Sequence, residues 1–391
     1  MEKNQTKKID KFLVIMLLIL WTVILGILVM MFLKSNSKKQ DVSIVETLPP
    51  LVEKKPEVYK LSLIMAGDVL IHSSIYKEAK VNEFSYDFTS MLEHIAPIIG
   101  EYDLAFCNQE TIIGGKDMGL SDYPRFNSPE EIGENLIDIG FNIFSLANNH
   151  SLDRGEQAIL NSVNFWKDKD VLTSGTYDSF EERNSHKILT KNNITYTMLS
   201  YTTLLNGLKI PSGKDYLVNL YDEETVKNDI ESIRDKVDVL MVSMHWGTEY
   251  TNTPIAEQRE IAQYLAGLGV DIIIGTHPHV VEPIEFIDNT MVIYSLGNFF
   301  SAQEGVNQLT GLLAAVEITK TIDDGNITIT FDNYRAELIY TYHKNFKNYK
   351  LYPYSMLDNS ILYNYQNHYE TYMNIVTKNT DKVFRVPLEG E

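Results

Sequence analysis

The stretch Leu61-Ser62-Leu63-Ile64-Met65-Ala66-Gly67-Asp68 joins an apolar run of strand length to a glycine and a carboxylate. Such a run is typical of a buried strand, and we expect the glycine to turn the backbone sharply at its end. Polar motifs follow later apolar runs in the same way. They are Asn108-Gln109-Glu110, Asn148-Asn149-His150, His245-Trp246-Gly247 and Gly275-Thr276-His277-Pro278-His279. Because α/β proteins build their active sites at strand ends, the pattern predicts one site assembled from these loops.

Apolar runs alternate with amphipathic helical stretches from about residue 59 onward. The predicted strands cover 61–66, 103–106, 142–146, 196–200, 237–244, 270–274 and 291–295, and the predicted helices cover 156–166, 223–234 and 255–268. Strands that alternate with helices indicate an α/β layered domain. Residues 312–319 and 327–332 flank Asp323-Asp324-Gly325-Asn326 and predict a hairpin with a turn longer than the tightest two-residue type.

Residues 12–33 form an uncharged apolar run that predicts a transmembrane helix. At about 1.5 Å per residue, a run of this length crosses a hydrocarbon core of roughly 30 Å. A cleaved signal peptide is the alternative, but its apolar core usually holds about 7–15 residues and ends in small residues that Ser35-Asn36-Ser37 supplies poorly. The basic residues at 1–11 favour a cytoplasmic tail, which places the main domain outside the cell. The polar, proline-containing segment 34–58 is predicted to be a linker.

Charge and cysteine content limit the classes of function. The chain of 391 residues has 34 basic and 53 acidic side chains, which gives a formal charge of −19. This acidity argues against a nucleic-acid partner, since nucleic acids need a basic surface. Cys107 is the single cysteine, so a disulfide framework and a thiolate metal cluster are both excluded. Any metal must therefore be held by nitrogen and oxygen ligands.

The strand-end motifs supply ligands of these two kinds. Asp68 is a natural first ligand, and Glu110 faces the same way as Asn108 because alternate residues of a strand share a side. His277 and His279 are spaced for the same reason to face one side. Taken singly, each motif has a simpler interpretation, because Gly-Asp usually marks a turn and a lone histidine is usually structural.

The conjunction of the motifs favours a metal centre. Asn149 can offer a carbonyl oxygen, His150 can act as a general acid, and His245 adds a further imidazole. Independent turns would not be expected to place so many ligand types just beyond strand ends. Asp153 has a second interpretation as the N-cap of the helix that follows. The sequence has no serine nucleophile elbow, Walker loop or dinucleotide fingerprint.

The ordered motifs, together with Ser295-Leu296-Gly297-Asn298-Phe299, resemble the CapA family of poly-γ-glutamate capsule synthesis proteins over residues 60–300. That family is similar to the calcineurin-like metallophosphoesterases, so the resemblance implies a four-layer α/β/β/α sandwich with a two-metal site. We expect this CapA-like domain at 59–340, followed by a Tyr/Asn-rich C-terminal extension at 341–391.

The resemblance also implies residue roles. Asp68 and His279 would hold a first metal, Glu110 would bridge, and Asn149, His245 and His277 would hold a second metal, with His150 as the catalytic imidazole. The family pattern commonly opens with Asp-x-His and bridges with Asp, whereas this chain has Asp68-Val69-Leu70-Ile71-His72 and Glu110. One bound metal therefore remains an alternative to two. Further candidates are His72, Asn108 and Arg125, the last of which lies in the family-like stretch Tyr123-Pro124-Arg125-Phe126-Asn127.

The resemblance implies a cell-surface protein that acts in synthesis, export or attachment of poly-γ-glutamate, with membrane-bound synthase subunits as partners. Mixed imidazole and carboxylate ligands favour Mn²⁺, Fe²⁺ or Zn²⁺. Catalysis would direct metal-activated water at a phosphoester or an amide. Two alternatives are a non-enzymatic scaffold of a polymer synthase and an extracellular metal-dependent phosphodiesterase or nucleotidase. Because like charges repel over a Debye length of about 8–10 Å, a polyanion would touch this acidic chain only locally, at the metals and Arg125.

Overall fold

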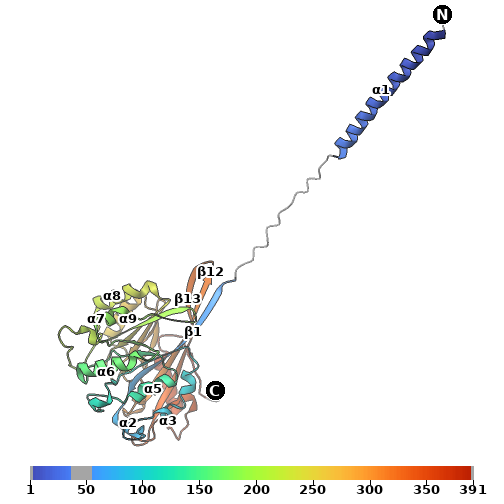
Figure 1. Cartoon of the computed structure of the whole chain (residues 1–391). Helices are drawn as coiled ribbons and strands as arrows, with labels where there is room; N and C mark the ends of the chain where they lie inside the picture. The colour runs from blue at the N-terminus through green and yellow to red at the C-terminus, as the bar shows by residue number, and fades with distance from the viewer. Residues whose placement is uncertain (1–2, 37–54, 389–391) are drawn as a thin grey trace. The chain divides into compact units, whose positions relative to one another are not determined.

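The computed structural model describes residues 3–36 and 55–388, which fall in two compact units, Met1–Lys54 and Lys55–Glu391. The first unit contains helix α1 (Lys3–Asn36) (Figure 1). Within it, Lys11–Asn36 is long and apolar enough to cross a bilayer, judged by length and composition alone. Residues 37–54 of the predicted linker, 1–2 of the predicted tail and 389–391 of the predicted extension lie outside the described residues.

The second unit contains two β-sheets, and each has a parallel centre. The nine-stranded sheet has the order β14-β13-β12-β1-β2-β3-β4, with β11 beside β1 and β15 beside β13. Its strands are β1 (Glu57–Leu70), β2 (Leu104–Asn108), β3 (Ile143–Ser145), β4 (Leu172–Ser174), β11 (Asn298–Ser301), β12 (Thr310–Asp323), β13 (Asn326–Tyr342), β14 (Lys350–Pro353) and β15 (Phe384–Arg385). Strands β1 to β4 run parallel, so their carboxyl ends lie at one edge of the sheet.

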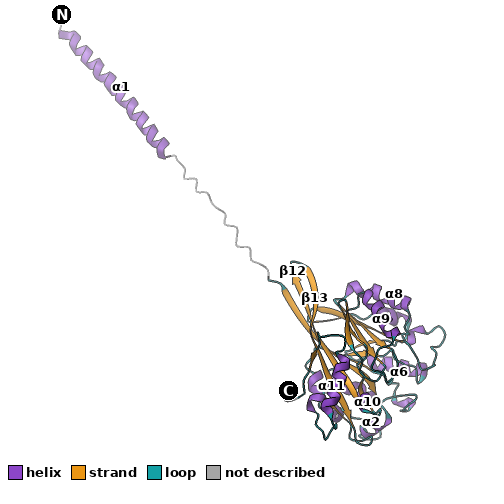
Figure 2. Cartoon of the chain, turned by 180° about the vertical axis from the view of Figure 1, so that it is seen from behind, coloured by secondary structure: helices purple, strands orange, loops and turns teal. Residues whose placement is uncertain are grey.

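The six-stranded sheet has the order β5-β6-β7-β8-β10-β9. Its strands are β5 (Leu189–Lys191), β6 (Ile194–Thr202), β7 (Val239–His245), β8 (Ile272–Thr276), β9 (Ile284–Ile287) and β10 (Thr290–Ile293). Strands β6, β7, β8 and β10 are mutually parallel. The longer helices are α5 (Glu130–Asp138), α6 (Gly155–Lys167), α8 (Glu223–Ile233), α9 (Ala256–Gly267) and α11 (Tyr365–Val376), and the shorter ones are α2 (Ser73–Glu78), α3 (Thr89–Leu92), α4 (Ala96–Ile99), α7 (Phe180–Ser185) and α10 (Val306–Leu309) (Figure 2).

Alternation along β1 assigns its side chains to two different cores. Leu63 and Met65 pack in a core that also holds Met241 and Ile274 of the other sheet, so the two sheets face each other. Ile64 lies in a second core with Trp166 of α6. A third core joins α8 and α9 to the six-stranded sheet. Each large apolar side chain buried in this way stabilises the fold by about 1.5–3 kcal/mol. Because the apolar runs of the sequence supply these side chains, they favour the mixed α/β architecture.

Each predicted strand and helix overlaps one in the structure, and most ends differ by a few residues, but β13 continues to Tyr342 where the prediction ended at residue 332. The prediction of a longer hairpin turn is wrong. Asp323 pairs with Asn326, which leaves a two-residue turn of Asp324 (φ 48°) and Gly325 (φ 85°). Aspartate tolerates the left-handed region and glycine has no Cβ to clash there, so this pair fits the tightest hairpin turn.

The expected sharp turn at Gly67 is also wrong, because β1 continues through Asp68 to Leu70. The glycine is needed for a different reason. A Cβ at residue 67 would lie 1.8 Å from the Gly297 carbonyl oxygen. Its absence lets β1 and the segment before β11 approach, and the Asp68 backbone N–H donates to the Gly297 carbonyl at 3.0 Å. The close approach holds Asp68 near the end of β1 without a turn.

The Tyr/Asn-rich C-terminal segment packs onto this unit. Strands β14 and β15 pair with β13, and Tyr369 and Met373 of α11 belong to the core between the sheets. The aromatic side chains of this segment therefore extend the core, although their spacing in the sequence has no clear period.

A buried carboxyl group beside α9 supports a prediction about stability and pH. Glu282 is fully buried and accepts a hydrogen bond from Gln258 Nε2 at 2.6 Å, while Gln258 Oε1 accepts from the Ile255 backbone N–H at the start of α9. Burial raises the pKa of Glu282 to about 8. The folded state therefore keeps a proton that the unfolded state releases above its ordinary pKa of 4.5, so stability is lost as the pH rises from 4.5 towards 8.

Glu282→Gln removes this ionisation and keeps the shape of the side chain. We expect the variant to exceed wild type in free energy of unfolding by about 4 kcal/mol at pH 8 and to match it closely near pH 4.5. Chemical denaturation of the full-length chain at both pH values measures the difference. An equal difference at both pH values would contradict the raised pKa.

Candidate metal centre

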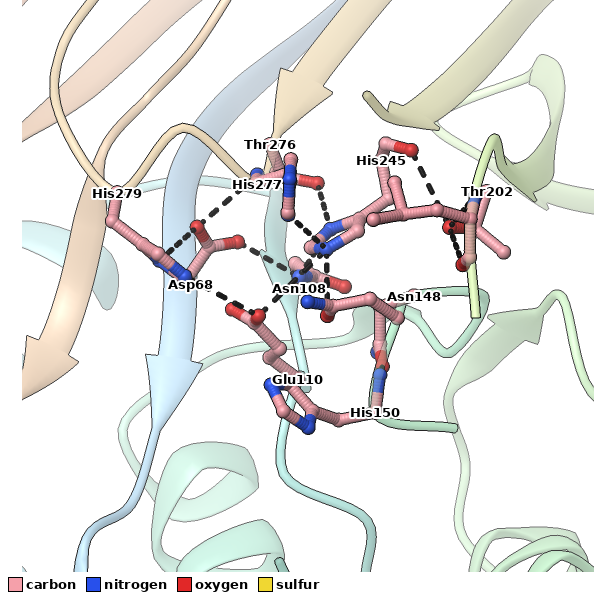
Figure 3. Close-up of polar contacts among 12 residues, drawn as sticks. Asp68, Asn108, Glu110, Asn148, His150, Thr202, His245, Thr276, His277 and His279 are labelled. Atoms are coloured by element: carbon pink, nitrogen blue, oxygen red, sulfur yellow. Dashed lines mark hydrogen bonds and ion pairs between the residues drawn. The ribbon is translucent and has the colours of Figure 1, made fainter. Parts of the chain in front are cut away.

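The predicted motifs of both sheets meet at the carboxyl ends of their parallel strands (Figure 3). Asp68 lies near the end of β1, Asn108 ends β2, and His245 ends β7. Glu110 lies in the loop after β2, Asn149 and His150 lie in the loop after β3, and His277 and His279 lie in the loop after β8. The register explains the meeting, because Asp68 pairs with Asn108 in one sheet and His245 pairs with Thr276 in the other. All of these side chains are buried.

A first group of ligand atoms is formed by Asp68, Glu110 and His279. His279 Nδ1 lies 3.2 Å from Asp68 Oδ2, and His279 Nε2 lies 3.7 Å from Glu110 Oε1. His279 Nδ1 is also 3.0 Å from Asn298 Oδ1. The ligand atoms of the group lie within 4.8 Å of one another, close enough to surround a single cation.

A second group is formed by Glu110, His245 and His277, so Glu110 belongs to both. His245 Nε2 lies 3.7 Å from Glu110 Oε1 and 3.2 Å from His277 Nδ1. Asn149 adjoins this group, with its Oδ1 3.0 Å from His245 Nε2. A carboxylate shared between two ligand groups is the arrangement expected of a bridging ligand in a two-metal site.

The polar atoms of the centre fit a cation. Neither carboxylate oxygen of buried Glu110 has a hydrogen-bond partner among the described residues, and Asn108 Oδ1 also lacks one there. An unpaired buried carboxylate is costly unless a cation or proton compensates it. Burial and the neighbouring Asp68 raise the pKa of Glu110 well above its ordinary value. A divalent ion would supply the missing compensation, and the nitrogen and oxygen donors suit Mn²⁺, Fe²⁺ or Zn²⁺.

The imidazoles differ in their electrostatic surroundings. Burial and the other imidazoles lower the pKa of His245 well below its ordinary value and that of His277 to about 3. Both rings are therefore neutral at physiological pH, the state in which imidazole binds metal. Burial alone would lower the pKa of His279, but Glu110 and Asp68 outweigh it and raise the value to about 9. That imidazolium ring would release its proton on binding a metal.

His150 stands outside the ligand groups found among the described residues. Its Nδ1 lies 2.7 Å from Asp153 Oδ2, and the same oxygen accepts from the Phe126 backbone N–H at 2.7 Å. The Phe126 ring packs against the imidazole almost at a right angle, with centroids 4.8 Å apart. Asp153 therefore orients His150. The N-cap interpretation of Asp153 is wrong. The N-cap residue of α6 is Arg154, and its side chain forms no capping hydrogen bond.

The three further candidates occupy different places. Asn108 Nδ2 donates to Asp68 Oδ1 at 2.8 Å and lies 3.3 Å from His245 Nδ1, so it links the two ligand groups. His72 belongs to none of the ligand groups that the described residues form, and its Nδ1 lies 3.0 Å from the Leu70 carbonyl oxygen. Arg125 is exposed. A third group pairs His277 and His279 with Glu249, an exposed residue that the sequence reasoning missed although it follows His245-Trp246-Gly247 closely.

A cleft of about 590 Å³ opens onto the centre. His279 lies where the cleft meets the first ligand group, and His72 and His150 also line its wall. Arg125, Glu249 and the exposed rings of Tyr123 and Tyr250 are also among the lining residues. We refer to this space as the metal cleft. It is large enough for a small-molecule group and brings it beside His150.

Comparisons with known proteins agree with the motifs. The family model of the bacterial capsule synthesis protein PGA_cap matches residues 62–303. Capsule biosynthesis protein CapA of Bacillus anthracis is 25% identical over 264 residues, which cover 65% of this chain and 62% of that protein. PGA biosynthesis protein CapA of Bacillus subtilis (strain 168) is 28% identical over 249 residues, which cover 61% and 63%. The chain thus spans less than two thirds of the length of these relatives.

The solved structures that resemble this chain do so only weakly. A putative 5'-nucleotidase from Staphylococcus aureus, in complex with alpha-ketoglutarate, has a TM-score of 0.43 at 14% identity, covering 79% of this chain and 58% of that chain. A hypothetical protein from Thermus thermophilus has a TM-score of 0.42 at 16% identity, covering 69% and 98%. At these TM-scores neither structure identifies an activity.

Proposed function

The chain belongs to the family of the bacterial capsule synthesis protein PGA_cap, and from this membership we propose a membrane-anchored protein that acts in synthesis, export or attachment of poly-γ-glutamate. The observation that carries the proposal is the pair of buried ligand groups that share Glu110 beside an open cleft. A site of this kind suits hydrolysis of a phosphoester or an amide. Membrane-bound synthase subunits are the proposed protein partners.

The proposal includes the finer architecture. The second unit would be a four-layer α/β/β/α sandwich of the metallophosphoesterase type, and its proposed boundary with the C-terminal extension, residue 340, falls near the end of β13. Three cores support the layering, since one lies between the sheets and one lies against the outer face of each sheet. The tail, anchor and linker would occupy 1–11, 12–33 and 34–58.

The ligand groups define which residues would hold metal. Asp68, Glu110 and His279 would bind one ion, and Glu110, Asn149, His245 and His277 would bind a second. When bound, such ions stabilise developing negative charge and make water a stronger nucleophile. Asn108 would hold the two ligand groups in place relative to each other, because its Nδ2 donates to Asp68 and lies beside His245.

The protein's own groups would handle the proton. Asp153 accepts from His150 Nδ1 and fixes the orientation of the ring, which leaves Nε2 to deliver a proton to the leaving group. Arg125, which lines the metal cleft, would position an anionic group of the substrate. Parallel measurement of metal content and hydrolysis in variants of His150 and of the ligand histidines tests this assignment.

The location of the protein gives a separate prediction. Because residues 12–33 are long and uncharged and lack a good cleavage site, the mature chain should keep this segment and expose its main domain outside. Protease treatment of intact cells should digest the domain while a cytoplasmic marker survives. Digestion only after lysis would show that the main domain lies inside the cell. A mature N-terminus near Ser35 would show that the apolar segment is cleaved off and does not anchor the protein.

A further inference from the structure

A second hollow lies beside the metal cleft. It measures about 750 Å³ and is lined by Met118–Ser121, by the start of α6 and by Lys209 with its neighbours. Arg125, Asp153 and Leu208 line both spaces, so the two adjoin at these side chains. We call the second space the side hollow. Each space alone has the volume of a small-molecule site, so the two together offer more room than one small group requires.

The charged side chains of the side hollow differ in whether they already have partners. The Arg154 guanidinium is occupied, since it donates to the Met118 carbonyl at 2.7 Å and the Gly119 carbonyl at 3.1 Å. Glu156 is occupied as well, because Lys214 Nζ lies 2.6 Å from its Oε1. Asp153 is occupied by His150. These three side chains therefore belong to the structure of the hollow rather than to a ligand.

Two cations remain for a ligand. Arg125 and Lys209 are both exposed, and within residues 3–36 and 55–388 neither side chain takes part in a hydrogen bond or an ion pair. Arg125 stands between the two spaces, whereas Lys209 lines only the side hollow. On a chain of charge −19, two unpaired cations in adjoining hollows favour an anion there over the surrounding surface.

The start of α6 adds to this field. Gly155 and Glu156 line the side hollow, and no side chain caps the first turn of this 13-residue helix. The Gly155 N–H already donates to the Leu152 carbonyl at 2.9 Å, but the aligned backbone dipoles of a helix still give its start a partial positive charge. This charge acts in the same direction as Arg125 and Lys209.

We propose that the side hollow is a second subsite for a linear polycarboxylate chain whose reacting group occupies the metal cleft. The inference rests on the proposed function and adds the shape of its substrate. Arg125 contacts the carboxylate nearest the metals, and Lys209 contacts the next one along the chain. The site therefore selects a chain with successive carboxylates over a single residue or a terminal group.

The test is a binding titration, which needs no turnover. The full-length protein in detergent micelles is loaded with Mn²⁺ and titrated with a dimer and an octamer of γ-linked glutamate. The octamer should bind more tightly. Lys209→Gln should lower the affinity for the octamer about three- to fivefold, which is the effect of one exposed charge pair. Its affinity for the dimer should equal that of wild type. Arg125→Gln should weaken both. Lys378→Gln, at an exposed position outside both hollows, is the matched control and should change neither.

Equal affinity for dimer and octamer, or equal weakening of both by Lys209→Gln, would overturn the second subsite. Tighter binding of a polyphosphate of octamer length would overturn its assignment to polycarboxylates. These results are separable from the proposed catalysis. Lys209-dependent octamer binding without hydrolysis supports the subsite and contradicts catalysis, whereas His150-dependent hydrolysis without length preference contradicts the subsite alone.

Discussion

His150→Ala should keep its metal and its fold and lose turnover by about 10²–10⁴-fold, the range for a missing general acid or base. The ring lies outside both proposed metal groups and is held by Asp153 at 2.7 Å, so its removal takes away a proton donor but no ligand. Hydrolysis of a chromogenic phosphodiester and release of polymer, measured beside metal content in the same preparations, give the result. His94→Ala is the matched control, because His94 stacks on Tyr352 away from the centre.

Asp68→Ala provides the contrast, because loss of a first ligand should remove metal and turnover together. In cells, the two variants also separate an enzyme from a scaffold. If His150→Ala and Asp68→Ala both support normal polymer production while deletion of residues 59–391 does not, catalysis at this centre is irrelevant and the scaffold alternative replaces it.

Replacing both His277 and His279 with Ala should abolish stoichiometric metal and all metal-dependent turnover. Each replacement removes a ligand from a different group, which leaves Glu110 with only Asp68 in the first group and with only His245 in the second, too few side chains for tight binding of an ion. The fold should persist, since both residues lie in the loop after β8 rather than in the three main cores. Elemental analysis and circular dichroism measure the two effects.

The control for this double variant is His343→Ala with His368→Ala, which removes two half-buried imidazoles outside the centre. Full metal content in the His277 and His279 variant would assign the ion to other residues. A loss of metal in the control as well would show that the effect is not specific to the centre.

The sequence predicts the site because the ligands directly follow apolar runs. Parallel strands align their carboxyl ends, so a motif after one strand lies beside a motif after the next. The pairs Asp68 with Asn108 and His245 with Thr276 illustrate this rule. Local spacing thus predicted which side chains would gather, although the division into two facing sheets depends on pairings between distant segments.

Other features depend on contacts that local patterns do not encode. From the sequence, Asp153 could cap a helix or orient His150. The structure shows that its carboxylate accepts from the Phe126 backbone N–H and contacts His150 Nδ1, so it orients the histidine. Gly67 is needed for the approach of Gly297, more than two hundred residues later in the chain. The side hollow likewise combines Met118–Ser121 with Lys209, which lie far apart in the sequence.

The most direct test of the central claim is the metal content of the wild-type full-length chain after reconstitution with Mn²⁺, Fe²⁺ or Zn²⁺ and removal of free ions. The unpaired oxygens of Glu110 and the neutral rings of His245 and His277 predict tight binding of one or two ions per chain. Wild-type protein that retains none of these ions would contradict the metal centre.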